Sequence, residues 1–225
     1  MFKSLINLFF PPVCAGCNEL LLSSETVICT SCRHRIPLTN FHLNPNNEAI
    51  GKFYGRLPVE FAAAFCFFNK KGIVQEMIHK LKYKGREEVG AVLGSWYASE
   101  LAETAKRLRF EAVIPVPLHP KRLRQRGYNQ VESFGRALAA GLNISYEDQI
   151  LKRQVYAKTQ TSKNLQLRST SAETFDITDI NQPGRHFLLV DDVITTGSTL
   201  EACGRALLKI PNSRISIACI AMSHS

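Results

Sequence analysis

The 225-residue sequence has no run of roughly 20 consecutive apolar residues, the length that a membrane-spanning helix needs. Residues 1–10 are apolar, but two prolines follow them and no small-residue cleavage site does, so we expect packing against the protein rather than a signal peptide. Weak contact with a membrane surface is the alternative. The chain also lacks internal repeats and low-complexity tracts. With 45% hydrophobic residues, it is expected to be a soluble globular protein of one large domain, with or without a small accessory module.

Acidic residues are scarce between His119 and Arg168. This segment contains ten Lys or Arg and three acids, so it carries +7 of the chain's formal net charge of +9. Such a concentration of cations favours a polyanionic partner, either a small polyphosphate or a nucleic-acid backbone.

Four of the seven cysteines form two Cys-x-x-Cys pairs, Cys14/Cys17 and Cys29/Cys32, separated by eleven residues. Two such turns can place four thiolates around one tetrahedral Zn²⁺, which leaves no open position for catalysis. Disulfides would need an oxidising compartment, and a redox pair would normally lie in a thioredoxin-like βαβ pattern. We therefore predict a structural zinc site with these four cysteines as ligands.

The other three cysteines, Cys66, Cys203 and Cys219, stand alone among apolar residues. Free cysteine behaves as a small hydrophobic residue, so we expect all three in the core.

Hydrophobic periodicity predicts a strand at 60–69 and helices at 72–83 and 87–108, with Trp96 on the core side of the second helix. From residue 111 onward, strands and helices alternate. The predicted strands are 112–118, 187–190 and 215–221, and the predicted helices are 131–142 and 200–208. This order predicts an α/β fold with a parallel sheet and right-handed crossovers. The expected domains are a cysteine module at 1–39, a linker at 40–58 and the α/β domain at 59–225.

The segment 187–199 reads Phe-Leu-Leu-Val-Asp-Asp-Val-Ile-Thr-Thr-Gly-Ser-Thr. Its apolar run is typical of a buried parallel strand, and Asp191 and Asp192 are expected where that strand ends, at the edge where open α/β sheets bind ligands. The hydroxyls and backbone N–H groups of residues 195–199 can surround an anion at the start of the next helix. Gly197 permits positive φ and close approach of a ligand. An acidic strand end followed by an ordinary helix cap is the alternative.

This motif resembles the phosphoribosyl pyrophosphate (PRPP) loop of type I phosphoribosyltransferases. The resemblance implies that Asp191 and Asp192 hold the ribose hydroxyls as catalytic and PRPP-binding residues. It also implies that a hydroxyl-rich loop binds the 5′-phosphate, and the residues of that loop are Thr195, Thr196, Gly197, Ser198 and Thr199. Mg²⁺ is implied as the companion of PRPP, where it neutralises the pyrophosphate leaving group.

Two basic segments are candidate phosphate contacts. The first comes after the strand at 112–118, where the resemblance implies a pyrophosphate loop, although Pro-Val-Pro stands where the family more often has glycine; its cations are Lys121, Arg122, Arg124 and Arg126. The second is the long unpatterned segment 152–168, which corresponds to a flexible loop that closes over substrate in related transferases. Its predicted contacts are Arg153, Lys158 and Arg168. Solvated surface loops are the alternative for both segments.

Taken together, the chain resembles the ComF/GntX family, named for competence protein F. The resemblance covers nearly the whole chain and is carried by six segments: the Cys₄ module, His79-Lys-Leu-Lys-Tyr-Lys-Gly85, Pro115-Val-Pro-Leu-His-Pro120, Arg126-Gly-Tyr-Asn-Gln130, Lys158-Thr-Gln160 and the motif at 190–199. It implies a cytoplasmic bacterial protein linked to uptake of transforming DNA.

These observations are compatible with two functions. The first is a phosphoribosyltransferase-like enzyme that binds PRPP or a phosphoribosyl nucleotide and serves DNA uptake or nucleotide metabolism, with an acceptor that the sequence does not identify. The second is a catalytically silent competence factor that binds single-stranded DNA and retains the PRPP site. Tyr83, Tyr128 and Tyr156 lie among basic residues and would stack on bases in that case, and packing in the core is the alternative for each. The DNA-uptake machinery is the expected partner in both.

Overall fold

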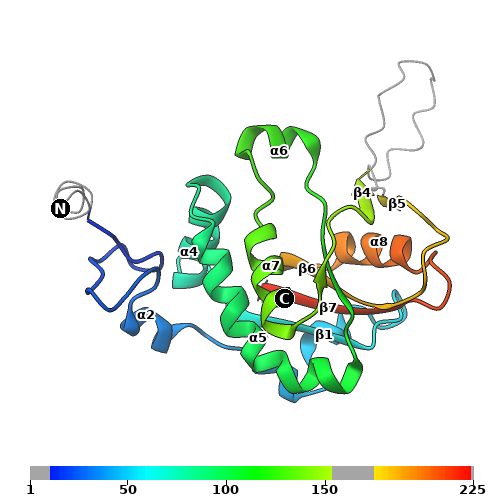
Figure 1. Ribbon diagram of the computed structural model, residues 1–225. Helices are drawn as coiled ribbons and strands as arrows, with labels where there is room; N and C mark the ends of the chain where they lie inside the picture. Colours follow the sequence, from blue (N-terminus) through cyan, green and yellow to red (C-terminus); the bar gives the residue numbers. More distant parts are fainter. Residues whose placement is uncertain (1–10, 154–174, 224–225) are drawn as a thin grey trace, which may run out of the picture.

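The computed structural model describes residues 11–153 and 175–223. Its centre is a five-stranded parallel sheet with the order β1-β7-β6-β2-β3 (Figure 1). The strands are β1 (Phe61–Phe68), β2 (Ala112–Pro115), β3 (Ser145–Tyr146), β6 (His186–Ile194) and β7 (Arg214–Ser223). The α/β fold class predicted from the sequence is confirmed.

The central strands are buried on both faces. In β7 every residue from Ile215 to Met222 is buried, and the first five residues of β6 are buried as well. Because a parallel sheet is covered by its crossover helices, its strands are apolar runs rather than alternating patterns. The apolar run before Asp191 therefore becomes the middle of the sheet.

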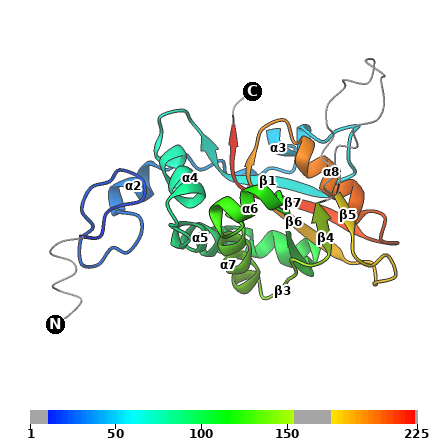
Figure 2. The same cartoon turned by 90° about the horizontal axis from the view of Figure 1, so that it is seen from above.

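Helices cover both faces of the sheet (Figure 2). On one face lie α5 (Glu88–Leu108) and α7 (Glu132–Leu142), and on the other lie α3 (Glu48–Gly51) and α8 (Ser198–Leu207). The helix α4 (Ile73–Tyr83) comes after β1, and α6 (Pro120–Arg126) comes after β2 at the carboxyl end of the sheet. None of the helices in the described ranges is long and apolar enough to cross a membrane.

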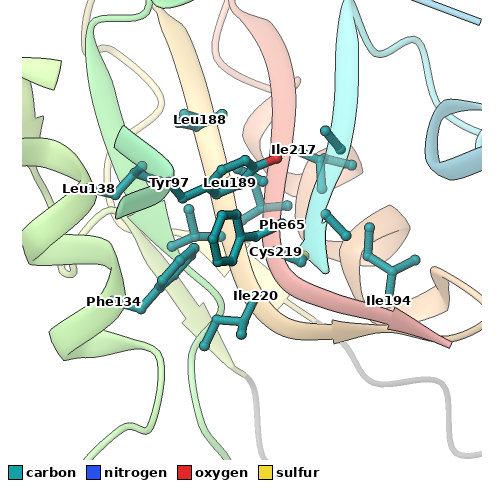
Figure 3. Close-up of a cluster of buried hydrophobic side chains, with 14 of the residues drawn as sticks. Phe65, Tyr97, Phe134, Leu138, Leu188, Leu189, Ile194, Ile217, Cys219 and Ile220 are labelled. Carbon is teal, nitrogen blue, oxygen red and sulfur yellow. The ribbon is translucent and has the colours of Figure 1, made fainter. Parts of the chain in front are cut away.

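Aromatic rings join the sheet to α5 and α7 (Figure 3). The Tyr97 ring lies between Phe65 and Phe134, with ring centroids 5.2 and 6.4 Å away. The Trp96 and Phe65 rings pack in a T-shaped arrangement with centroids 5.0 Å apart, and Trp96 is half-buried. The three isolated cysteines are fully buried, as predicted, and Cys219 lies in this cluster.

The segment 119–130, predicted as a basic loop, contains the two-turn helix α6. The His119 side chain accepts a hydrogen bond from the Lys121 backbone N–H at 3.1 Å, and Pro120 occupies the first helical position. Gly127 ends the helix with φ +82°. These are ordinary start and stop signals, but four cations in six residues obscure the helical pattern.

The polar region after β3 contributes an antiparallel pair, β4 (Leu151–Arg153) with β5 (Phe175–Ile177). In the N-terminal part, α2 (Thr30–Arg35) includes the last residue of the second cysteine pair. Residues 40–58, predicted as a linker, contain the 3₁₀ helix η1 (Phe41–Leu43) and α3, and they bury Phe53 and Leu57. This stretch is therefore packed structure, whereas the predicted domain boundaries remain predictions.

The contact between α5 and α7 generates a first testable prediction. A Cβ atom on Gly94 would lie 2.4 Å from the Phe134 carbonyl oxygen and 3.0 Å from the Ala137 Cβ. Gly94→Ala should therefore lower the free energy of unfolding by about 1–3 kcal/mol, although alanine is intrinsically the better helix former. Urea denaturation measures this change. Gly51→Ala in α3 is the matched control, because a Cβ there meets nothing within 4 Å and stability should not fall. Equal stability of both variants would contradict the close approach.

Candidate functional site

Asp191 and Asp192 lie where β6 extends beyond the end of the neighbouring strand β2. On the β2 side the pairing of β6 ends at Val190, opposite Pro115, whereas on the β7 side it continues to Ile194, opposite Met222. Asp191 and Asp192 therefore lie inside β6 rather than after its end, which corrects the predicted strand bounds. From β2 the chain moves outward to β3, and from β6 it moves the other way to β7. The acids thus face the crevice at this reversal of strand order, where open α/β sheets bind ligands.

The hydroxyl-rich loop turns from β6 into α8. Gly197 has φ +76°, as its predicted role requires, and the Thr196 and Ser198 hydroxyl oxygens are 2.9 Å apart. A small hollow is lined by all five predicted loop residues and by Asp191. The hollow opens at the N-terminus of α8, whose backbone N–H groups and dipole favour an anion.

A second, strongly basic hollow of about 120 Å³ lies beside the acids, on the β2 side of β6. It is lined by Asp191, Asp192, Thr199 and four cations, which are Lys82, Arg122, Arg126 and Arg153. The structure thus brings three of the predicted basic residues to the acids. The helical repeat explains which ones, since Arg122 and Arg126 are four residues apart on one face of α6.

Other predicted cations are not brought into this hollow. Lys121 and Arg124 are exposed on α6 and do not line it. Lys158 and Arg168 lie outside the described residues, as does Tyr156.

The Asp192 carboxylate is buried and is held from two sides. Lys82 Nζ lies 3.0 Å from Oδ1, and Gln130 Nε2 donates to Oδ2 at 2.7 Å. Gln130 in turn accepts a hydrogen bond from Arg126 at 2.6 Å. A buried charge requires such partners, so Asp192 fixes the positions of α4 and of the α6–α7 connection relative to β6.

The tyrosines near this network have different surroundings. Tyr128 is half-buried and donates its hydroxyl to the Leu81 carbonyl, which ties the α6–α7 connection to α4. Tyr83 is 62% exposed, with the Arg126 guanidinium 5.0 Å from its ring centroid. Of the two, Tyr83 is the one whose ring is accessible for stacking.

Sequence reasoning missed Lys82 and Gln130. Both lie in segments that carry the family resemblance, 79–85 and 126–130. The resemblance therefore pointed to these segments, but it did not assign a role to either residue. The partner of Lys82 is 110 residues away along the chain. Hydrophobic periodicity predicts which face of a helix is buried, but it does not predict which distant residue a side chain on that helix will contact.

The stretch 40–58 also supports the hydroxyl-rich loop. Arg56 donates to the Thr196 carbonyl oxygen at 2.8 Å and pairs with Glu201 in the first turn of α8. Arg205 and Arg56 hydrogen-bond the Glu201 carboxylate and lower its pKa. The ring of Phe53 lies against Gly197, where an added Cβ would be 3.0 Å from it. The loop is therefore braced by side chains from residues 40–58.

The four N-terminal cysteines come together as predicted. Their sulfur atoms all lie within 4.8 Å of one another, and Cys17 Sγ is 3.7 Å from Cys29 Sγ. Burial disfavours the Cys14 thiolate, but backbone N–H groups, including those of Cys29 and Gly16, donate to its sulfur and lower its pKa to about 6. A thiolate that accepts backbone N–H groups in a four-sulfur cluster has the donor set of a structural zinc site. The cluster therefore fits a metal ion.

The helix α4 joins the cysteine cluster to the acids. Lys80 Nζ donates to the carbonyl oxygens of Cys14 and Ala15 at 3.1 and 3.0 Å. Two residues later, Lys82 reaches Asp192. One helix thus carries a lysine to each of the two candidate sites.

Comparison with known proteins agrees with this architecture. The family "Phosphoribosyl transferase domain" matches residues 132–225, which include β6, the hydroxyl-rich loop and α8. Competence protein F of Haemophilus influenzae is 36% identical over 222 residues, which cover 93% of this chain and 96% of that protein. DNA utilization protein YhgH of Escherichia coli K12 is 24% identical over 211 residues, which cover 92% of this chain and 89% of that protein. Competence protein ComFC of Bacillus subtilis is 22% identical over 201 residues, which cover 84% of this chain and 81% of that protein.

The parallel sheet, its strand order and the matched domain define a phosphoribosyltransferase-like α/β protein with an N-terminal four-cysteine cluster. Within that class, the chain belongs to the competence protein F (ComF/GntX) family.

The bracing of Gly197 generates a second prediction. Gly127 and Gly197 both have positive φ, but an added Cβ meets nothing at Gly127 and the Phe53 ring at Gly197. Gly127→Ala should lower the free energy of unfolding by about 1–2 kcal/mol through backbone strain alone. Gly197→Ala should lower it further, because the ring must also move. Urea denaturation of the two variants gives the difference, and equal losses would contradict the contact with Phe53.

Proposed function

We propose that this phosphoribosyltransferase-like protein binds PRPP at the carboxyl end of β6 and transfers its phosphoribosyl group to a nitrogen acceptor. The observation that supports the proposal is that the loop hollow and the basic hollow, both suited to anions, lie next to each other beside Asp191 and Asp192. The loop hollow fits a single phosphate, and the basic hollow with its four lining cations fits a pyrophosphate. Asp191 lines both hollows, where a carboxylate would accept hydrogen bonds from ribose hydroxyls between the two phosphate groups.

Each group of residues would have its own role in binding and transfer. The loop at 195–199 holds the 5′-phosphate, and Asp191 orients the ribose. The basic hollow binds the pyrophosphate and stabilises the negative charge that develops as the bond from C1′ to its oxygen breaks. Lys82 and Gln130 keep Asp192 in place. These roles rest on placement, and Asp191 and Asp192 are the proposed catalytic pair.

Mg²⁺ fits the donor set at this site. Hard cations prefer carboxylate and phosphate oxygens, and Asp191 lines the hollow assigned to pyrophosphate. When bound, Mg²⁺ supplies neutralisation of the leaving group's charge. Asp191 lines both the loop hollow and the basic hollow, so it is the carboxylate we assign to the metal.

The biological setting is proposed from the relatives. Two of them are named for competence and one for DNA utilization, so we propose that this protein acts in the cytoplasm on material from DNA uptake or in nucleotide metabolism. The DNA-uptake machinery is the proposed partner.

Arg122 and Arg124 provide a matched test of PRPP binding. Both are exposed cations on α6, but only Arg122 lines the basic hollow. Arg122→Ala should weaken binding of PRPP with Mg²⁺ by about ten-fold or more, because a charge-assisted hydrogen bond to phosphate contributes roughly 1.5–3 kcal/mol. Arg124→Ala should bind as the wild type does. Isothermal titration calorimetry measures both constants, with Asp191→Asn/Asp192→Asn as a variant expected to lose binding. Wild-type protein that does not bind PRPP would contradict the proposal.

A second candidate function is binding of single-stranded DNA. The exposed cations Lys121 and Arg124 outside the hollow favour it, together with the accessible ring of Tyr83. The backbone of single-stranded DNA interacts with cations spread over the whole surface of the protein. Loss of either cation should therefore have the same effect, so Arg122→Ala and Arg124→Ala should weaken DNA binding equally and reduce its salt dependence. Unequal effects on PRPP with equal effects on DNA would indicate two separate sites. Undetectable DNA binding at low salt would reject this candidate.

We also propose that the cysteine cluster holds one structural Zn²⁺, with Cys14, Cys17, Cys29 and Cys32 as ligands. Purified protein should contain one zinc per chain by elemental analysis, and Cys32→Ser should lose it. Cys203→Ala is the control, because Cys203 is buried in α8 away from the cluster and zinc should be retained. Because structural zinc contributes to folding free energy, chelation should also lower the thermal midpoint. Disulfides between these cysteines, detected by mass spectrometry of protein kept under reducing conditions, would contradict the assignment.

A further inference from the structure

The helix α4 is held by polar contacts on two sides. It lies between the N-terminal part of the chain and the sheet in both Figure 1 and Figure 2. Lys80 and Lys82 are two residues apart, so they leave the helix axis in directions that differ by about 200°. Lys82 pairs with Asp192 at 3.0 Å, whereas Lys80 contacts the first cysteine turn, residues 14–18. Because apolar packing is not directional, these two contacts help to define the rotation of α4 about its axis.

The Lys80 ammonium group uses all of its donors on the first cysteine turn. Its Nζ donates to the carbonyl oxygens of Cys14 and Ala15 at 3.1 and 3.0 Å, and also to the side-chain oxygen of Asn18. A lysine ammonium group has three N–H donors, so the set is complete. Such charge-assisted hydrogen bonds are stronger than neutral ones. A displacement of the turn therefore either moves Lys80 with it or breaks these hydrogen bonds.

The N-terminal part of the chain contacts the α4 region at two further points. A Cβ on Gly16 would lie 2.7 Å from the side chain of Ile73, which is the first residue of α4. Beyond the other end of α4, Arg86 donates to the Val13 carbonyl oxygen at 3.5 Å. Close-packed contacts transmit small displacements, so a shift of the cysteine turn is expected to reach the helix.

The same helix supports the site of the proposed function. Lys82 lines the basic hollow and holds the Asp192 carboxylate. A preorganised binding site must keep its groups within about 0.5 Å of the productive geometry, so a small displacement of Lys82 is enough to weaken binding. Lys80 does not line the basic hollow. An effect of Lys80 on PRPP therefore has to pass through α4.

We infer that Lys80 is a positioning residue for the PRPP site, and that it couples this site to the four-cysteine cluster. The inference rests on the proposed function. With the four thiolates held at one metal ion, the carbonyl oxygens of the first cysteine turn have fixed positions, and Lys80 holds α4 against them. Lys82 is then kept in place beside Asp192. Removal of the metal should therefore weaken PRPP binding, although no cysteine of the cluster lines either anion-binding hollow.

Lys80 and Lys84 provide matched variants for the test. Lys84 follows the last residue of α4, is exposed and does not line the basic hollow. Lys80→Met should weaken binding of PRPP with Mg²⁺ by about five-fold or more, the lower end of the range for coupling between two sites. Lys84→Met loses the same charge and should bind as the wild type does. Lys80→Arg, which still donates to carbonyl oxygens, should restore most of the affinity.

The contribution of the cysteine cluster is tested by removing zinc. Lys80→Met should retain its zinc, because Lys80 supplies no thiolate. Zinc is chelated from the wild type and from Lys80→Met, and the chelator is removed before Mg²⁺ and PRPP are added. Calorimetry below the thermal midpoint of the zinc-free protein should show weaker PRPP binding to the wild type and little further loss in Lys80→Met. Such non-additive effects indicate that both changes act through one contact.

Asn18→Gly is a second variant, should Lys80→Met fail to fold. It removes one acceptor of the Lys80 ammonium group, and glycine suits the backbone of this residue, whose φ is +65°. We expect it to retain zinc and to bind PRPP more weakly than the wild type does. Unchanged PRPP affinity in this variant would count against the coupling.

Three results would overturn the inference while the wild type still binds PRPP. The first is Lys80→Met that is less stable but binds PRPP as the wild type does, since Lys80 would then only fasten the N-terminal part. The second is equal weakening by Lys84→Met. The third is zinc removal that weakens PRPP binding equally in the wild type and in Lys80→Met, since the coupling would then bypass Lys80.

Failures of the earlier proposals give different results. A wild type that does not bind PRPP removes the proposed function itself. A wild type that contains no zinc contradicts the metal assignment, and the comparison of Lys80→Met with Lys84→Met then still tests the role of Lys80.

Discussion

The buried carboxylate of Asp192 is the contact on which the rest of the site depends. It receives Lys82 from α4 and Gln130 from the connection between α6 and α7, and these residues are 110 and 62 positions away in the chain. Burying an ion is costly unless charged or polar partners lie close to it. The need of Asp192 for such partners therefore holds β6, α4 and the α6–α7 connection together more specifically than apolar packing would. The crevice, the basic hollow and the wall of α4 take their positions from it.

The sheet was predictable because its signal is local. The apolar run before Asp191 and the alternation of strands and helices from residue 111 onward are enough to predict parallel strands in this order of appearance. The hydroxyl-rich loop was predictable for the same reason, since Gly197 and its neighbours form one contiguous motif. The two cysteine pairs also carry their geometry in their spacing, and the four sulfur atoms converge accordingly.

What sequence reasoning could not supply was the set of partners across the fold. Lys82 looks like one lysine among several on α4, and only the packing of that helix brings it to Asp192. Arg56 lies in a stretch whose Asn, Pro and Gly content suggested a linker, yet it binds the loop carbonyl of Thr196. The helix α6 was missed because its charged sequence has no apolar face to bury, although His119 and Gly127 mark its ends. The roles of Lys82 and Arg56 depend on contacts that local periodicity does not encode.

The helix α4 connects features that lie far apart in the sequence. Its Lys80 donates to the backbone of the first cysteine turn and its Lys82 pairs with Asp192. Its Gln75 and His79 line a hollow between α4 and the carboxyl ends of β1, β6 and β7. The contact with the cysteine turn is close, since a Cβ on Gly16 would lie 2.7 Å from the Ile73 side chain. A four-cysteine cluster distant from the acids therefore has a structural reason to be part of this protein. Through its contacts with Ile73 and Lys80, the cysteine turn supports the helix whose Lys82 pairs with Asp192.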